Sequence, residues 1–234
     1  MQIIEVTEFC GVRSAVFTFG HRTSPLRFVV FPMVHVGDAA FYAEVESRLR
    51  AVDVVIAEGI RGQSPHLRAM TSAYRWLEGS DRLDLVVQRI DYRSLGVPVV
   101  CPDMSAAEFD RAWRELPLRE SLPFTVLSPA FGLGLRLFGT RRFIAGLLGV
   151  DYLPSAEEIL AGDGVDALVV EARDRPLVEH IEATHDQLGD LPVVVAVVYG
   201  AHHVRAVVRS LTRLGYRVVD SEWLTVFEMD VPDR

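Results

Sequence analysis

The sequence predicts an α/β fold in which helices cover a central, mixed but mostly parallel β-sheet. Three short, continuous apolar runs, at residues 53–59, 97–103 and 191–200, are typical of strands that are buried on both faces. Segments in which apolar residues recur with helical spacing lie between them. The chain has 234 residues and is 50% hydrophobic, which is enough apolar material for one core. We therefore expect residues 1–234 to form a single domain.

An antiparallel hairpin is expected near the start of the chain. Residues 14–19 and 26–32 are β-rich runs, and the turn-forming sequence GHRTSP separates them. Such a hairpin adds antiparallel strands to the parallel ones, so the predicted sheet is mixed.

The other elements are predicted from hydrophobic periodicity and from residues that begin or end helices. Asp38 is placed as an N-cap, and Pro176 predicts a kink or restart in a long helix. Pro117 and Pro123 are expected to bound a turn-rich connection. Helices are expected at residues 38–52, 66–77, 82–90, 104–116, 165–189 and 202–215, and one or two strands at 216–227.

A Gly-rich apolar segment, residues 117–153, is expected to form a helical insert within this domain. Its most apolar part, residues 124–150, is interrupted by three arginines, so it lacks the roughly twenty consecutive apolar residues that span a membrane. Two alternatives stay open for this part. It forms two buried core helices separated by a turn near Gly139, or it lies on a membrane surface or covers a groove.

The composition excludes several classes of protein. All 24 basic residues are Arg, so a Schiff-base lysine and a phosphate-loop lysine are both absent. The net charge of -8 disfavours a nucleic-acid partner that is held by phosphate contacts. Two cysteines are too few for a disulfide framework, and the chain starts without a secretory leader. We therefore expect a cytoplasmic protein.

Polar side chains follow the apolar runs at the positions where a parallel sheet places its site. In open α/β sheets the site lies outside the carboxyl ends of the strands. The residues that end the runs are His35, Glu58, Asp103, His202 and His203. Two imidazoles and one or two carboxylates from different strands indicate a divalent-metal site. The alternative for His35 is a structural role, capping the helix that follows it.

Only one of the two adjacent histidines is expected to face this site, because neighbouring helical residues point about 100° apart. The Gly-x-x-His spacing from Gly200 selects His203. His202 should then face sideways, toward solvent or a neighbouring loop.

A charged group on the helix at 165–189 is a further candidate. Glu171, Arg173 and Asp174 form either a solvated helix face or part of the site, with Arg173 directed into the cleft to stabilise an oxyanion. The common HExxH, GxSxG, CxxC and GxGxxG motifs are absent from the sequence.

These residues lie in three segments that resemble the conserved blocks of the TraB/PrgY/GumN family. The segments are residues 35–60, 169–181 and 197–220. That family is related in fold to the Tiki proteases and to ChaN-like and erythromycin-esterase-like proteins. The resemblance therefore implies an α/β fold of the Tiki, ChaN and erythromycin-esterase type with a hydrolytic site.

The resemblance also implies which residues form that site. The matching positions are His35, Glu58, Glu171, Arg173, Gly200 and His203, and His202 is the additional histidine. The first block departs from the family pattern, because Pro32 stands where the family has Gly.

We expect a metal-dependent hydrolase that acts on peptides. His35, His203 and either Glu58 or Glu171 are the predicted ligands of a divalent ion, Mn²⁺, Co²⁺ or Zn²⁺, that activates water. Whichever of Glu58 and Glu171 does not bind the ion is the predicted general base, and Arg173 stabilises developing negative charge. The alternative is a non-catalytic module of the same fold that binds a peptide, a signal or a small molecule, with weak contact to a membrane surface. The sequence predicts no oligomeric state.

Overall fold

A mixed β-sheet forms the centre of the structure, a computed structural model that describes residues 1–78, 80–148 and 163–230. Within these residues the sheet has seven strands. They are β1 (Ile4–Thr7), β2 (Gly11–Gly20), β3 (Arg27–Met33), β5 (Val54–Ala57), β7 (Val99–Val100), β8 (Val194–Gly200) and β9 (Arg217–Phe227). Their order is β1-β2-β3-β8-β5-β7, and β9 also pairs with β2.

The predicted combination of parallel and antiparallel strands is confirmed. β3, β8, β5 and β7 run parallel to one another, and β2 pairs antiparallel with β1, β3 and β9. β2 and β3 are the two strands of the predicted hairpin. β8 is continuously apolar because it lies inside the sheet with both faces covered, and residues 195–199 are fully buried.

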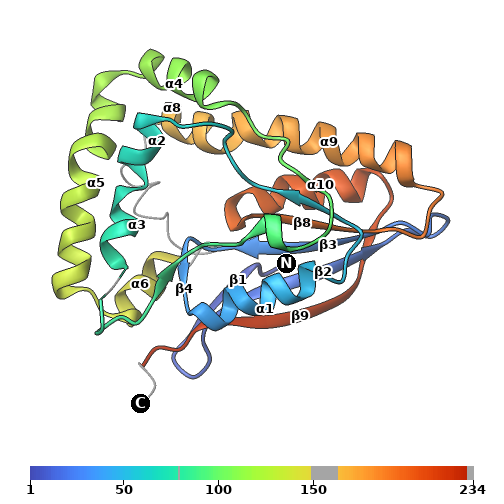
Figure 1. Cartoon of the computed structure of the whole chain (residues 1–234), viewed down its shortest axis with the longest axis horizontal. Helices are drawn as coiled ribbons and strands as arrows, with labels where there is room; N and C mark the ends of the chain where they lie inside the picture. The colour runs from blue at the N-terminus through green and yellow to red at the C-terminus, as the bar shows by residue number, and fades with distance from the viewer. Residues whose placement is uncertain (79, 149–162, 231–234) are drawn as a thin grey trace.

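Helices cover both faces of this sheet. α9 (Ala172–Leu188) and α10 (Val204–Arg213) lie on one side of it, and α1 (Ala39–Leu49) lies on the other (Figure 1). Each of these helices buries an apolar stripe against the core; the buried residues are Phe41, Tyr42, Val45 and Leu49 of α1, Leu177 and Ile181 of α9, and Val204, Val207 and Leu211 of α10. The coarse fold class is therefore the predicted one.

A second group of helices stands beyond the carboxyl ends of the parallel strands (Figure 1). It comprises α2 (Pro65–Met70), α3 (Ser72–Leu77), α4 (Ala106–Glu115), α5 (Leu118–Phe138) and α6 (Arg141–Leu148). α5 and α6 belong to the predicted apolar insert, and the helix ends near Gly139, as expected. Residues 149–153 of that insert lie outside the described residues.

Two predictions about secondary structure are wrong. Residues 82–90 are not a helix: Asp84 has a φ of 47°, and β6 (Val86–Val87) pairs with β4 (Val36–Gly37). The region from Pro117 to Pro123 is not a turn-rich connection, because Pro117 is the N-cap of α5. Pro123 and Pro129 lie inside this helix, which continues through both.

The burial of α5 also differs from the buried-core alternative. Several of its large apolar side chains are exposed, and Leu118 and Phe138 at its two ends are 78% and 79% exposed. Among the described residues α5 is the one helix that is long and apolar enough to be a candidate membrane span, by length and composition alone. A single candidate of this kind does not establish a transmembrane segment.

Candidate functional site

The candidate site lies where three parallel strands end. Glu58 directly follows β5, Asp103 lies three residues after β7, and Gly200 is the last residue of β8. Because β7, β5 and β8 are neighbours in the sheet, these three positions lie along one edge. Arg173 and Asp174 approach this edge from α9, and His203 lies in a short 3₁₀ turn after β8, η3 (Ala201–His203). We call Glu58, Asp103, Arg173, Asp174 and His203 the charged cluster.

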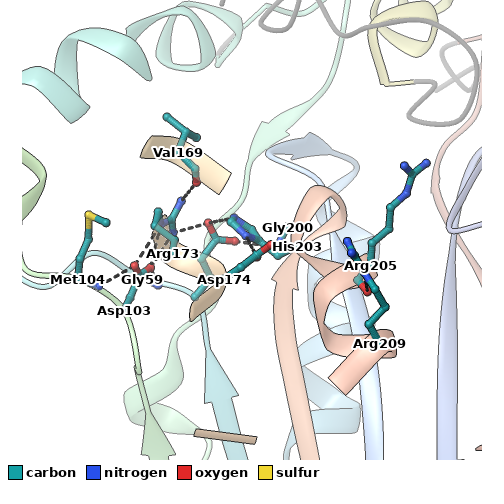
Figure 2. A network of polar contacts seen from close by, with 11 residues as sticks. Gly59, Asp103, Met104, Val169, Arg173, Asp174, Gly200, His203, Arg205 and Arg209 are labelled. Atoms are coloured by element: carbon teal, nitrogen blue, oxygen red, sulfur yellow. Dashed lines mark hydrogen bonds and ion pairs between the residues drawn. The ribbon is translucent and has the colours of Figure 1, made fainter. Parts of the chain in front are cut away.

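Arg173 is the centre of the charged cluster, and its side chain is only 9% exposed. Its Nη2 lies 2.6 Å from Oε1 of Glu58 and 2.6 Å from Oδ2 of Asp103. Its Nε lies 3.1 Å from Oδ1 of Asp103, so the guanidinium holds that carboxylate with two nitrogens. Figure 2 shows Arg173 between Asp103 on one side and Asp174 and His203 on the other.

Backbone amides fix the position of Asp103, whose side chain has no exposed surface. The N–H of Gly59 donates to Oδ2 at 3.2 Å, and the N–H of Met104 donates to Oδ1 at 2.8 Å (Figure 2). A buried carboxylate is costly unless it is paired and hydrogen-bonded, and both oxygens of Asp103 meet that condition. Asp103 therefore holds Arg173 at the end of the sheet.

Glu58 is bound on both of its oxygens. Oε1 faces Arg173, and Oε2 accepts a hydrogen bond of 2.7 Å from the N–H of Gly200. A side chain at position 200 would crowd this contact, because a Cβ there would lie 3.1 Å from Oε2. Burial alone would raise the pKa of Glu58, but the contact with His203 and the charge of Arg173 outweigh it and hold that pKa well below its usual range.

His203 lies between two carboxylates. Its Nδ1 is 2.8 Å from Oδ1 of Asp174, and its Nε2 is 3.6 Å from Oε1 of Glu58. Burial disfavours the charged imidazolium, but the hydrogen bond to Asp174 and the contact with Glu58 favour it more strongly. The balance raises the pKa of His203 to about 9, so the imidazole is charged at neutral pH.

An irregular helical turn precedes Arg173. Residues Ala167–Glu171 form a π-helical turn, in which the N–H of Ala172 bonds to the carbonyl of Ala167. Turns of this kind are rare and occur frequently at functional sites. The chain then continues as α9, which runs through Pro176. The π-helical turn therefore lies before Pro176, the position at which the sequence predicts a kink or restart. Ala172 alone separates this turn from Arg173 and Asp174.

The structure brings three of the five predicted site residues together: Glu58, Arg173 and His203. His35 is exposed at the end of β3, where its ring packs 4.9 Å from that of Tyr74, and it is close enough to help lower the pKa of Glu58. Glu171 is exposed and lies outside the charged cluster. Its predicted role as a general base stays a prediction.

Asp103 and Asp174 take positions that the sequence did not assign to them. Asp103 was expected at the end of a strand, but nothing in the sequence paired it with Arg173, 70 residues away. The sequence groups Asp174 with Arg173 as part of a charged helix face. Its place in the site is evident only from its hydrogen bond to His203 in the structure. His203 is the histidine that joins the cluster, as predicted, whereas His202 is half-buried and lines a cavity.

The described residues do not fit the predicted divalent ion as they stand. They contain no group of three or more His, Cys, Asp or Glu side chains that could hold a metal ion. Glu58 and His203 offer two donors, but Glu58 already lies against the guanidinium of Arg173. A divalent cation at Glu58 would therefore be repelled by a permanent positive charge next to it.

An apolar cavity of about 180 Å³ lies beside the charged cluster. Its floor includes His35 after β3 and residues 200–202 at the end of β8, and its walls come from α2, α3, α5 and α6. The insert therefore packs over the ends of the strands, as predicted for a segment that covers a groove. Gly200 belongs both to this floor and to the site, because its N–H binds Glu58.

The chain matches no family model, no curated protein and no solved structure.

Proposed function

We propose that the chain is a hydrolase of the TraB/Tiki type, with the charged cluster as its reaction centre. The observation that carries this proposal is the Asp174–His203–Glu58 arrangement beside the buried Arg173, at the edge of the sheet where α/β proteins bind their ligands. Buried charges add little net stability compared with apolar residues of similar volume. A concentration of perturbed ionisable groups next to a cavity is instead typical of functional sites.

The arrangement suits acid catalysis. A histidine that is charged at neutral pH and oriented by an aspartate can donate the proton on Nε2 to a leaving group. Arg173 offers fixed donors to negative charge that develops on a carbonyl oxygen. Glu58 is a weak base because its pKa is low, so its role is to hold His203 and Arg173 in position. Glu171, the other carboxylate predicted as general base, is exposed and lies outside the charged cluster, so its role stays a prediction.

The substrate class and the metal rest on the resemblance to the TraB/PrgY/GumN family. That resemblance implies peptides as substrates and a divalent ion, Mn²⁺, Co²⁺ or Zn²⁺, as the cofactor. Both stay predictions, and a metal that binds would have to compete with Arg173 for Glu58.

A screen of the wild-type protein and Glu58→Gln tests this proposal. Peptides, esters and amides would be offered as substrates after chelation with EDTA and with each of the three ions added. We expect turnover of at least one class, and a loss of about a hundredfold or more in Glu58→Gln. Glu179→Gln is the matched control, because Glu179 is an exposed residue of α9. Absence of turnover under every condition, or full activity in Glu58→Gln, would contradict the proposal.

One observation favours a second candidate, a non-catalytic binding module that meets a membrane surface. Large apolar side chains of α5 and α6 outside the cavity lining are exposed: Leu118, Leu122, Leu133, Leu137, Phe138 and Phe143. The same helices carry the exposed residues Arg119, Arg136 and Arg142, although the whole chain has a net charge of -8. An apolar face with arginines beside it is suited to an anionic lipid surface.

Co-sedimentation with vesicles tests this second candidate. Binding to vesicles that contain phosphatidylserine, weaker binding to phosphatidylcholine alone and loss of binding in Phe138→Glu would support it. Leu191→Glu, at an exposed position outside α5 and α6, is the control and should bind like the wild-type protein. Equal recovery of protein in the supernatant with and without vesicles would exclude it.

A further inference from the structure

The apolar cavity has one polar side and mostly apolar walls. Its polar side is the floor, where His35 and His202 lie beside Gly200. The walls carry two hydroxyl groups, those of Tyr74 and Ser128, and the Ser128 hydroxyl donates to the carbonyl of Met70 at 2.8 Å. The other wall side chains are apolar, so apolar groups suit this space.

The floor connects the cavity to the charged cluster. Gly200 lines the cavity, its N–H donates to Glu58, and a Cβ built on it would lie 3.7 Å from Cδ2 of His203. The backbone of Gly200 therefore separates the cavity from Glu58 and His203 by the thickness of one residue without a side chain. A molecule whose apolar part fills the cavity would leave its polar part on the floor, beside His35, His202 and Gly200.

The size of the cavity limits the apolar part of such a molecule. A cavity of about 150 Å³ lined by apolar side chains is known to hold one benzene ring. The 180 Å³ here is slightly larger. By that comparison it accommodates a single ring or an aliphatic chain of about six to eight carbons.

We propose that this cavity binds the apolar end of an amphipathic small molecule, an aliphatic chain of about six to eight carbons, with the polar end on the floor beside His35, His202 and Gly200. The evidence for this binding site is the cavity itself and does not depend on the proposed hydrolase function. Its assignment as a substrate site, for an ester or amide of a medium-length acyl group, rests on the proposed hydrolase function.

Binding of N-acyl glycinamides with acyl chains of 2 to 12 carbons, measured by isothermal titration calorimetry, tests this proposal. Each methylene that enters the cavity should increase the affinity about three- to fourfold. The increase should stop at about eight carbons, where the cavity is full. An affinity that does not depend on chain length would overturn the proposal.

Variants that fill the cavity provide the structural test. Ala73→Phe places a ring in the cavity from α3 and should reduce binding of the octanoyl compound at least tenfold. Leu147→Trp fills it from α6 and serves if Ala73→Phe does not fold. Ala130→Phe, at an exposed position of α5, is the matched control and should bind like the wild-type protein. Unchanged binding in a folded cavity variant would also overturn the proposal.

Hydrolysis of the same compounds is measured separately. Binding that follows chain length and disappears in Ala73→Phe, without hydrolysis, supports the cavity site and contradicts the hydrolase. Hydrolysis with no dependence on chain length supports the hydrolase and contradicts the cavity site.

Discussion

Arg173 is the residue on which the charged cluster depends most. It neutralises Glu58 and Asp103, and Asp103 has no exposed side-chain surface. Arg173→Met would leave these carboxylates buried without their cation, which costs about 3–5 kcal/mol of the free energy of unfolding. Arg175→Met, an exposed position two residues further along α9, should change it by less than about 0.5 kcal/mol. Urea unfolding of both variants measures the difference, and equal stabilities would show that the cluster is not balanced by Arg173.

His203 should make the stability of the protein depend on pH. Its pKa of about 9 in the folded chain lies above the unfolded value of 6.5, so its charged form favours folding. This contribution is complete below about pH 6.5 and is lost as the pH rises through 9. It amounts to up to about 3 kcal/mol.

The comparison of His203→Gln with His202→Gln isolates this effect. Between pH 6.5 and 9.5 the wild-type protein and His202→Gln should lose stability relative to His203→Gln, measured by urea unfolding at each pH. Parallel pH profiles for all three proteins would show that His203 is not held as an imidazolium by Asp174 and Glu58.

At the scale of the elements, the packing of α3 against α5 depends on a close contact of Gly132. A Cβ on Gly132 would lie 2.6 Å from the Cα of Ala73 and 2.7 Å from its carbonyl oxygen. Gly132→Ala should therefore force the helices apart and cost about 1–3 kcal/mol. This contact also positions the wall of the cavity.

Gly134 provides the matched control in the same helix. Nothing lies within 4 Å of a Cβ at Gly134, so Gly134→Ala should stabilise the protein by about 0.5–1 kcal/mol through helix propensity. Thermal unfolding of the two variants measures this difference. Melting temperatures that shift in the same direction would show that α3 and α5 do not pack as described.

The elements that the sequence predicted correctly are those with a strong pattern. The continuous apolar run that became β8 and the helical stripe that became α10 were both recognised. The structure of residues 82–90 is predicted incorrectly, because a short apolar run does not distinguish a helix from a two-residue strand such as β6. The local preference of Pro123 predicts the end of a connection, but α5 continues through this residue, so the local preference does not decide the structure there.

At the scale of the whole molecule, the topology explains why part of the site was predictable. Glu58 and His203 follow apolar strands. Sites in α/β proteins lie at the carboxyl ends of parallel strands, so both residues could be predicted as site residues. That rule does not say which helix packs over these ends. The pairing of Arg173 with Asp103, and of Asp174 with His203, depends on the placement of α9, which no local pattern encodes. The π-helical turn ahead of Arg173 also could not be predicted from the sequence.

The rate of hydrolysis by His203→Gln, relative to His202→Gln, tests the central claim most directly. Both histidines lie in the same short turn, but only His203 bonds to Asp174 and faces Glu58. With the best substrate from the screen, we predict that His203→Gln loses about a hundredfold or more in kcat. His202→Gln, on the cavity floor, should change KM and leave kcat within about threefold of the wild-type protein. Equal losses in the two variants, or a larger loss in His202→Gln, would contradict the claim that the charged cluster is the reaction centre.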